Sequence, residues 1–546
     1  MRGLMMDSPL TLSALLRHAE SLHGGREIVS RRADRSLHRY TYRECLERAR
    51  RLGASLRALG LQRGDRVATF AWNHQRHLEA YFGLPAAGFV LHTLNLRLHA
   101  DDLTYIANDA GDRAAIVDEM LWPVFEKFAG RVPFEHVVVM TENGVAPEGT
   151  LDYDTLLASA EAEPFPDLDD EREAAAMCYT SGTTGKPKGV VYSHRALVLH
   201  SMGTVMPDVI GLSSKDAVLP IVPMFHANAW GIPYSAALVG AKQVLPGRFL
   251  DAQSVVELLA AERVTVTCGV PTIWLGVLDF LDAHAGEHDL SALRHMTVGG
   301  SAAPESMIRA FDERHGITIL QGWGMTETSP VASISSDRPG SESWTPEERQ
   351  HYRATAGQPL PLVEIRARGD DGLVPWDGVS MGELEVRGPW VAAAYHGRDA
   401  DEAFTTDGWF RTGDIVTIGP NAELIIQDRC KDLVKSGGEW ISSVLLENCL
   451  MGHPSVAEAA VIAVPHAQWV ERPLAVVVSR AGCRANAEEL RSFLGESFAK
   501  WWVPDAVVFT DVLPRTATGK VRKLDLRQVY GGAYASGAST TESPTR

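Results

Sequence analysis

The sequence predicts an α/β fold, with a large N-terminal domain of layered α/β subdomains plus a β-rich subdomain, and a small α+β C-terminal domain. Three observations predict it. The chain has 546 residues, which exceeds the usual size of one hydrophobic core. Short β-branched runs alternate with helical patterns over most of the chain, as parallel α/β folds require. After about residue 360 the runs become shorter, and Gly and Asp separate them.

The expected strands of the large domain are short runs rich in Val, Ile, Ala and Thr. They cover residues 66–72, 114–118, 136–140, 264–271, 293–300 and 316–324. Residues 41–60 and 251–264 carry apolar side chains at three- and four-residue spacing, which predicts amphipathic helices over the sheets. The first 20 residues predict a leader and an amphipathic helix, with no export signal.

The β-rich subdomain is expected from short strands at 363–374, 382–390 and 423–429. A boundary follows near residues 429–431, and a helix and strands at 442–465 and 472–480 predict a compact module. We therefore expect an N-terminal domain at 1–430, a C-terminal domain at 431–532 and a disordered tail at 533–546.

Composition excludes some function classes. The formal net charge of −17 disfavours nucleic acid as a partner, because phosphate recognition needs a basic surface. Six scattered cysteines, with no CxxC pair, indicate free thiols and a cytoplasmic protein. No apolar run is long enough for a transmembrane segment, although transient membrane contact stays open.

The most informative segment is Tyr179–Gly189, which we expect to be a loop between a strand and a helix. Its glycines let the backbone approach an anion, its hydroxyls donate hydrogen bonds and its lysines supply charge, a combination that suits a polyphosphate. It is not a Walker A loop, because a proline follows Lys186. The alternative, a mobile surface loop, does not explain so dense a combination.

With this loop the sequence resembles the adenylate-forming superfamily of acyl-CoA ligases, luciferases and peptide-synthetase adenylation domains. Further motifs of that superfamily recur in order along the chain: Gln321–Thr328, Arg411–Asp414, Asp428–Lys435 and Pro514–Lys520. The resemblance implies ATP and Mg²⁺ as cofactors. It also implies that the larger domain binds AMP and the acyl group, and that the small domain is mobile.

The resemblance assigns a large set of residues to the nucleotide and to coenzyme A. These are Thr180, Ser181, Gly182, Thr183, Thr184, Gly185, Lys188, Gly300, Ser301, Ala302, Gln321, Gly322, Trp323, Gly324, Thr326, Asp414, Arg429, Lys435 and Trp440. Trp323 offers an aromatic face to adenine where relatives have Tyr or Phe. Asp414 would grip the ribose hydroxyls, although a lone Asp after Gly is more often a turn residue. Glu327 and Thr180 would hold the metal, although such a glutamate alone is more often a surface or capping acid.

Three residues are expected to be catalytic. Lys520 would reach the substrate carboxylate and α-phosphate, and Lys431 occupies the superfamily's hinge position. Relatives place a histidine at the position of His226, beside the carboxylate or the CoA thiol. An isolated histidine more often satisfies a buried hydrogen bond, so both readings of His226 stay open.

The acid is suggested by a closer resemblance to bacterial medium- and long-chain fatty acyl-CoA synthetases, carried by residues 223–234, 270–274 and 435–443. Substrate-binding residues expected from it are Phe225, Ala227 and Trp230. Residues 298–302 lack side-chain bulk, so Val298 and Gly299 would let the acyl chain or adenine lie against the backbone, although a tight strand exit explains this segment equally well. In long-chain relatives the tryptophan at Trp230 gates an apolar tunnel, where each buried methylene contributes about 0.8 kcal/mol. Ordinary core packing is the alternative for Phe225 and Trp230. The same branch includes ligases for short methylthio-substituted acids.

The predicted activity is therefore that of an ATP-dependent acyl-CoA ligase. It forms acyl-AMP from a carboxylic acid with release of pyrophosphate, and then the CoA thioester. Two alternatives stay open: an adenylating enzyme that loads a separate carrier protein, and a nucleotide-binding regulator without catalysis. The resemblance also implies a homodimer formed through the N-terminal domain.

Overall fold

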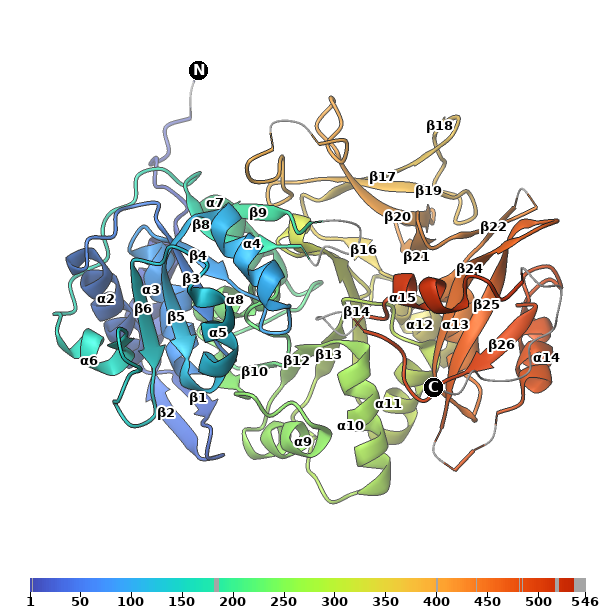
Figure 1. Cartoon of the computed structure of the whole chain (residues 1–546), viewed down its shortest axis with the longest axis horizontal. Helices are drawn as coiled ribbons and strands as arrows, with labels where there is room; N and C mark the ends of the chain where they lie inside the picture. The colour runs from blue at the N-terminus through green and yellow to red at the C-terminus, as the bar shows by residue number, and fades with distance from the viewer. Residues whose placement is uncertain are drawn as a thin grey trace.

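The computed structural model describes residues 1–534 except 2, 181–185, 399–400, 438, 481, 484 and 516–519. The described residues form four β-sheets with helices packed against them (Figure 1). The predicted fold class is confirmed: two mixed sheets and a β-rich subdomain form the large part, and a small α+β part follows. Of the predicted disordered tail, residues 535–546 lie outside the described part.

One mixed sheet occupies the middle of the large domain. Its strands in spatial order are β16 (Gln358–Pro359), β15 (Val331–Ile334), β14 (Thr318–Gly324), β13 (His295–Val298), β12 (Val266–Gly269), β10 (Ala217–Pro220), β11 (Lys242–Leu245), β1 (Glu27–Arg31) and β2 (Leu37–Thr41). The strands from β14 to β1 pair in parallel, so their carboxyl ends meet at one edge. Ligands of open α/β sheets bind at that edge.

The second mixed sheet lies beside it. Its order is β7 (Leu151–Asp152), β6 (His136–Met140), β5 (Asp112–Asp118), β3 (Arg66–Phe70), β4 (Val90–Thr93), β8 (Ala174–Tyr179) and β9 (Gly189–Ser193). Its strands pair in parallel except at one end, where β8 and β9 are antiparallel.

The β8–β9 pair corrects one prediction. The loop after Tyr179 does not enter a helix directly, because residues 189–193 first form β9, and α7 (His194–Thr204) begins only after it. The β-branched and aromatic run Val190–Tyr192 pairs with β8, which explains the extra strand. The loop therefore connects two antiparallel strands.

The remaining sheets follow in the chain. The β-rich subdomain has the order β18 (Gly372–Leu373), β17 (Glu364–Gly369), β19 (Gly382–Arg387), β20 (Phe410–Ile418) and β21 (Leu424–Arg429). The last sheet has the order β23 (Glu439–Ile441), β22 (Val434–Ser436), β25 (Val470–Ser479) and β24 (Val456–His466), with β26 (Ala506–Phe509) on β25. Sheet membership thus changes between β21 and β22; the domain limits at 430 and 532 stay a prediction.

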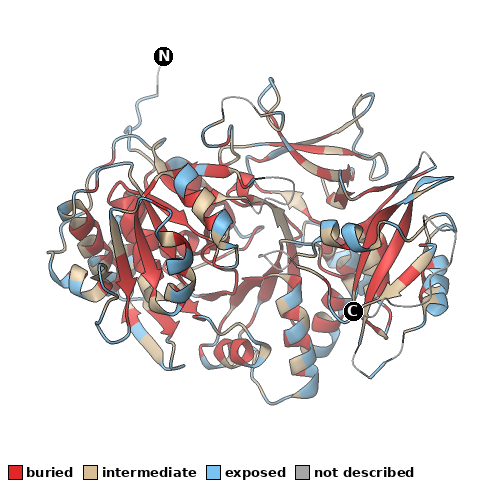
Figure 2. Ribbon diagram, viewed as in Figure 1, coloured by how far each residue is buried: buried red, intermediate tan, exposed pale blue. Residues whose placement is uncertain are grey.

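Helices cover the sheets, and the interior between them is buried (Figure 2). In the large domain they are α1 (Leu12–His23), α2 (Tyr42–Ala58), α3 (Gln75–Ala86), α4 (Ala100–Ala110), α5 (Trp122–Ala129), α6 (Tyr153–Ala158), α7, α8 (Ile232–Val239), α9 (Ala252–Ala261), α10 (Pro271–Ala283), α11 (Glu305–His315) and α12 (Pro346–Arg353). In the small domain they are α13 (Ser443–Met451), α14 (Ala487–Ser497) and α15 (Lys523–Tyr530). The predicted helices at 1–20, 41–60 and 251–264 correspond to α1, α2 and α9.

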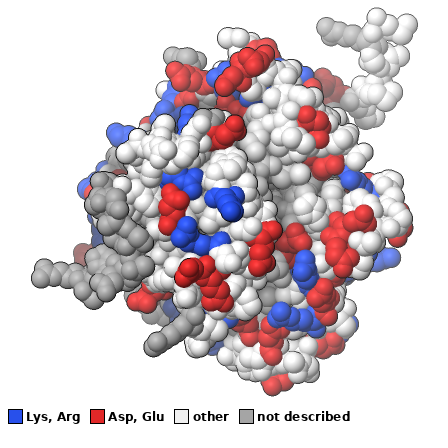
Figure 3. All heavy atoms as spheres, turned by 90° about the vertical axis from the view of Figure 1, so that its right-hand side faces the viewer, with Lys and Arg blue, Asp and Glu red and all other residues white. Residues whose placement is uncertain are grey.

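The surface shows the charge balance expected from composition. On the face in Figure 3, acidic and basic side chains are intermixed. Within the described part of the chain, no helix is long and apolar enough to cross a membrane. The cysteines, all of which are described, are free thiols as predicted.

Candidate active site

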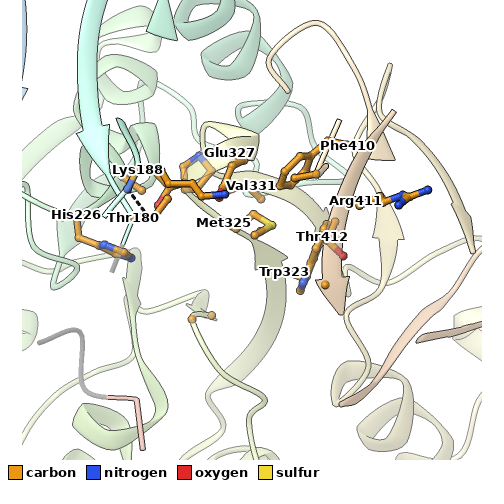
Figure 4. A pocket seen from close by; sticks show the side chains of 18 of the residues that line it. Thr180, Lys188, His226, Trp323, Met325, Glu327, Val331, Phe410, Arg411 and Thr412 are labelled. Carbon is orange, nitrogen blue, oxygen red and sulfur yellow. Dashed lines mark hydrogen bonds between the residues drawn. The ribbon is translucent and has the colours of Figure 1, made fainter. Parts of the chain in front are cut away.

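Strand ends from the sheets converge on a cavity of about 680 Å³ (Figure 4). It lies where the carboxyl ends of β8, β13 and β14 meet β20 of the β-rich subdomain. Predicted site residues that line it are Thr180, Lys188, His226, Ala227, Trp230, Gly299, Gly300, Gly322, Trp323, Gly324, Thr326, Glu327, Arg429 and Lys520. Residues separated by 340 positions in the chain are therefore brought to one place.

Other predicted site residues lie outside the cavity lining. Phe225 and Val298 pack in hydrophobic cores, the alternative that had stayed open for Phe225. Gln321 is buried, and its side-chain oxygen accepts a hydrogen bond from the backbone of Ala303 at 2.6 Å. The others off the lining are Ser301, Ala302, Asp414, Lys431, Lys435 and Trp440. Ser181, Gly182, Thr183, Thr184 and Gly185 lie outside the described residues.

The wall predicted to hold the nucleoside is a hydrogen-bonded unit. The Trp323 indole N–H donates to Oδ2 of Asp414 at 2.9 Å. Arg429 Nε lies 2.7 Å from Oδ1 of the same carboxylate, since Asp414 and Arg429 face each other across β20 and β21. Asp414 is only 3% exposed. The Asp414 carboxylate is not part of the cavity lining, but its contacts with Trp323 and Arg429, which both line the cavity, hold it in place.

The opposite wall carries the groups predicted to hold phosphates and metal. Thr180 and Lys188 pair at the base of the β8–β9 loop, where the backbone N–H of Lys188 donates to the Thr180 hydroxyl at 3.1 Å (dashed in Figure 4). Glu327 is buried and accepts a hydrogen bond from the Tyr395 hydroxyl at 2.6 Å. Glu327 and Thr180 thus present hard oxygen donors to one cavity, which fits Mg²⁺ shared with phosphate oxygens.

Comparisons with known proteins agree with this geometry. Residues 16–396 match the family described as AMP-binding enzyme, and residues 445–520 match the AMP-binding enzyme C-terminal domain. The chain belongs to the AMP-binding enzyme family. The adenylate-forming superfamily predicted from the motifs is therefore confirmed.

The AMP-binding enzyme has curated relatives that match over nearly the whole chain. It is 51% identical over 535 residues to a long-chain-fatty-acid–CoA ligase of Thermus thermophilus, covering 97% of each chain. It is 42% identical over 548 residues to a medium-chain-fatty-acid–CoA ligase of Ectopseudomonas oleovorans, covering 99% and 100%. A 3-methylmercaptopropionyl-CoA ligase of Ruegeria pomeroyi is 45% identical over 538 residues, covering 97% and 99%.

Solved structures share the fold of the AMP-binding enzyme. An anthranilate CoA ligase in complex with anthranoyl-AMP superimposes with a TM-score of 0.86 at 25% identity, covering 97% of this chain and 99% of that one. ATP-bound MatB from Rhodopseudomonas palustris gives 0.81 at 26% identity, covering 96% and 99%. MatB therefore binds ATP in this fold.

Burial sets the protonation of the cavity's reactive groups. Burial, with Arg429 nearby, lowers the pKa of Lys520 to about 8. Burial and the charge of Lys520 lower the pKa of His226 to about 4, so its imidazole is neutral at pH 7. Burial raises the pKa of Glu327, while the hydrogen bond from Tyr395 lowers it. A neutral histidine beside a charged lysine suits a site that receives anions.

The segment predicted to bind the acyl group has an unusual backbone. Ala227, Asn228, Ala229 and Trp230 all have left-handed conformations, with φ from 42° to 56°. Each such residue costs roughly 1–2 kcal/mol, and strain of this kind is tolerated at functional sites. The turn places the Trp230 ring against Gly299, where a Cβ would lie 2.9 Å from it. Trp230 and Gly299 both line the cavity at this contact.

Several lining residues escaped the sequence analysis. Tyr395, Arg398 and Glu402 line the cavity, and they lie in residues 391–404, which match none of the five motifs. Tyr395 meets Glu327 across 68 positions of the chain. A contact at that separation leaves no local pattern, so no signal in the sequence marks it.

Proposed function

We propose that this protein is an ATP-dependent fatty acid–CoA ligase. It forms acyl-AMP and pyrophosphate from a fatty acid and ATP, and then transfers the acyl group to coenzyme A. The observation that carries the proposal is the convergence, in one cavity, of Thr180, Lys188, Trp323, Glu327 and Lys520 together with Trp230. The names of the relatives at 42–51% identity support the same activity.

In adenylation, a carboxylate oxygen attacks the α-phosphorus of ATP and pyrophosphate leaves. The approach of two anions is the electrostatic difficulty. Lys520, held in the cavity with its charge, offsets that repulsion and stabilises the charge that develops at the α-phosphate. Asp414, fixed by Trp323 and Arg429, holds the ribose and so aims the α-phosphate at the acid.

Mg²⁺ would be held by Glu327 and Thr180 together with phosphate oxygens, and when bound it neutralises phosphate charge. Tyr395 keeps the Glu327 carboxylate directed at the site. We further propose that the protein is cytoplasmic and forms a homodimer through its N-terminal domain. Light scattering that gave a monomer at micromolar concentration would remove the dimer.

Thioester formation follows when the CoA thiol attacks the acyl-adenylate and AMP leaves. Lys435 and Trp440, predicted to contact CoA, lie on the β22–β23 hairpin away from the cavity, and the Lys435 ammonium rests 4.4 Å above the Trp440 ring. The proposal therefore includes a turn of the small domain about Lys431 between the two steps.

A second candidate substrate is a short methylthio-substituted acid. The relatives named 3-methylmercaptopropionyl-CoA ligase, at 44% and 45% identity, support it as strongly as the medium-chain relative supports a fatty acid. Chain length separates the two, because an apolar tunnel gains about 0.8 kcal/mol per methylene that it buries.

The test is pyrophosphate release with ATP and Mg²⁺ against straight-chain, methylthio-substituted and aromatic acids, with and without CoA. A fatty acid–CoA ligase releases pyrophosphate faster as the alkyl chain lengthens and needs CoA for turnover. Turnover that a phosphopantetheinylated carrier protein supports and CoA does not would refute the ligase. Release confined to methylthio-substituted acids would assign the second substrate.

A further inference from the structure

The carboxylate of Asp401 forms an ion pair with Lys188, a lysine that lines the cavity. Oδ2 of Asp401 lies 2.7 Å from the Lys188 ammonium and 3.8 Å from an Arg398 guanidinium nitrogen. The other oxygen of Asp401 accepts a hydrogen bond from the backbone of Ala403 at 3.1 Å, which fixes the carboxylate independently of Lys188. The side chains of Asp401 and Lys188 are 14% and 31% exposed, so water screens the pair only in part.

Lys188 lies in the part of the cavity where we expect the polyphosphate to bind. Lys188 and Arg398 both line the cavity, beside Thr180 and Glu327. Partial burial acts to raise the pKa of Asp401, but the hydrogen bond and charge of Lys188 hold it below its ordinary value, so the carboxylate is charged at pH 7. An anion at this place repels phosphate oxygens and competes with them for the same cations.

We infer that Asp401 is an intramolecular competitor for pyrophosphate, which gives up Lys188 when the polyphosphate binds and takes it back when pyrophosphate leaves. The inference rests on the proposed function, because pyrophosphate is the product of adenylation. Release of pyrophosphate then exchanges one ion pair of Lys188 for another, so this partly buried cation is never left unpaired. Lys188 also keeps its contact with the Tyr395 ring, 4.4 Å away, which limits how far the ammonium moves. Asp401 therefore weakens ground-state binding of the polyphosphate and speeds release of the product.

The decisive measurement is calorimetric titration of inorganic pyrophosphate, and separately of ATP, each with Mg²⁺, into the full-length protein. Asp401→Asn keeps the shape of the side chain and removes the competing charge. We expect the dissociation constant of pyrophosphate to fall about tenfold, the value of one charged hydrogen bond. A gain in affinity is not what a damaged fold produces. The pyrophosphate off-rate should fall in parallel.

Two control experiments distinguish the effect of the Asp401–Lys188 ion pair from a general effect of negative charge near the cavity. Glu402→Gln removes the same charge one residue away, at a side chain that also lines the cavity, and should tighten binding less than about threefold. In a Lys188→Ala background, Asp401→Asn should tighten binding much less than in the wild type, because only the longer contact of Asp401 with Arg398 remains. Equal tightening in Glu402→Gln, or in the Lys188→Ala background, would overturn the inference.

Failure of the inference is distinguishable from failure of the proposed function. Wild-type protein that binds ATP and pyrophosphate with the same constants as Asp401→Asn would refute the competition alone. Wild-type protein that binds neither would refute the adenylating activity and the competition with it.

Discussion

We expect adenylation to depend on pH through the protonation of Lys520. Because burial and Arg429 lower the pKa of Lys520 to about 8, its charged form falls from about 90% at pH 7 to about half at pH 8 and about 10% at pH 9. Asp414 and Glu327 face the same ammonium and act in the opposite direction, whereas Lys431 adds to the lowering. If adenylation needs the charged form, kcat/KM for ATP falls about tenfold per pH unit above pH 8.

The assay is single-turnover formation of acyl-AMP without CoA, from pH 6 to pH 9.5, at ATP concentrations below KM. The neutral His226, with a pKa of about 4, does not titrate in this window. At saturating ATP the phosphates raise the pKa of Lys520, so kcat should stay level to a higher pH than kcat/KM.

Lys520→Arg is the matched control, because a guanidinium stays charged throughout the range. Its profile should be flat above pH 8, whatever its absolute rate. Lys520→Ala should abolish adenylation and leave thioester formation from supplied acyl-adenylate largely intact. A wild-type profile that is level to pH 9.5, or an arginine variant that declines like the wild type, would refute the reasoning.

The remaining predictions concern the other walls of the cavity. Trp323→Phe keeps an aromatic face but removes the indole donor to Asp414, the carboxylate proposed to bind the ribose, so the KM for ATP should rise about threefold to tenfold in steady-state assays; an unchanged KM would show that the donor does not matter. Tyr395→Phe removes the hydroxyl that orients Glu327, and the Mg²⁺ concentration for half-maximal rate should rise about tenfold, with no such shift if the hydroxyl is only structural. Gly299→Ala brings a Cβ to 2.9 Å from the Trp230 ring, and should lower kcat/KM for long acids more than for short ones; equal losses would disprove a role of that contact in chain-length selection.

Local patterns predicted most of the fold. The β-branched runs at 114–118 and 136–140 became β5 and β6 because buried parallel strands need apolar residues on both faces. The prediction that the loop after Tyr179 leads to a helix missed β9, because Gly189 looks like a continuation of the glycine-rich loop. The pairing of Gly189 with Tyr179 is a contact between two strands, which the sequence of either strand alone does not reveal.

The candidate site was predicted to the extent that it is made of motifs. Glycine, hydroxyl and carboxylate residues at fixed spacing mark Thr180, Glu327 and Lys520, all of which line the cavity. The side chains that contact the motif residues were not predicted. Tyr395 and Asp401 belong to no motif, and only the fold brings them into contact with Glu327 and Lys188.

The small domain places only one of its two predicted functional segments at the cavity, and the proposed two-step reaction accounts for this. Lys520 lines the cavity, while Trp440, on the same domain, is 39% exposed and does not. Lys523, close after Lys520, pairs with Glu447 of α13 at 2.7 Å, and α13 follows the β22–β23 hairpin almost directly. The segment that carries Lys520 and the hairpin that carries Trp440 are therefore connected through α13. Separate loop movements cannot bring both of them to the cavity at once. If Trp440 serves the thiol step, the whole domain has to turn, and we expect the turn at Lys431, which lies between β21 and β22.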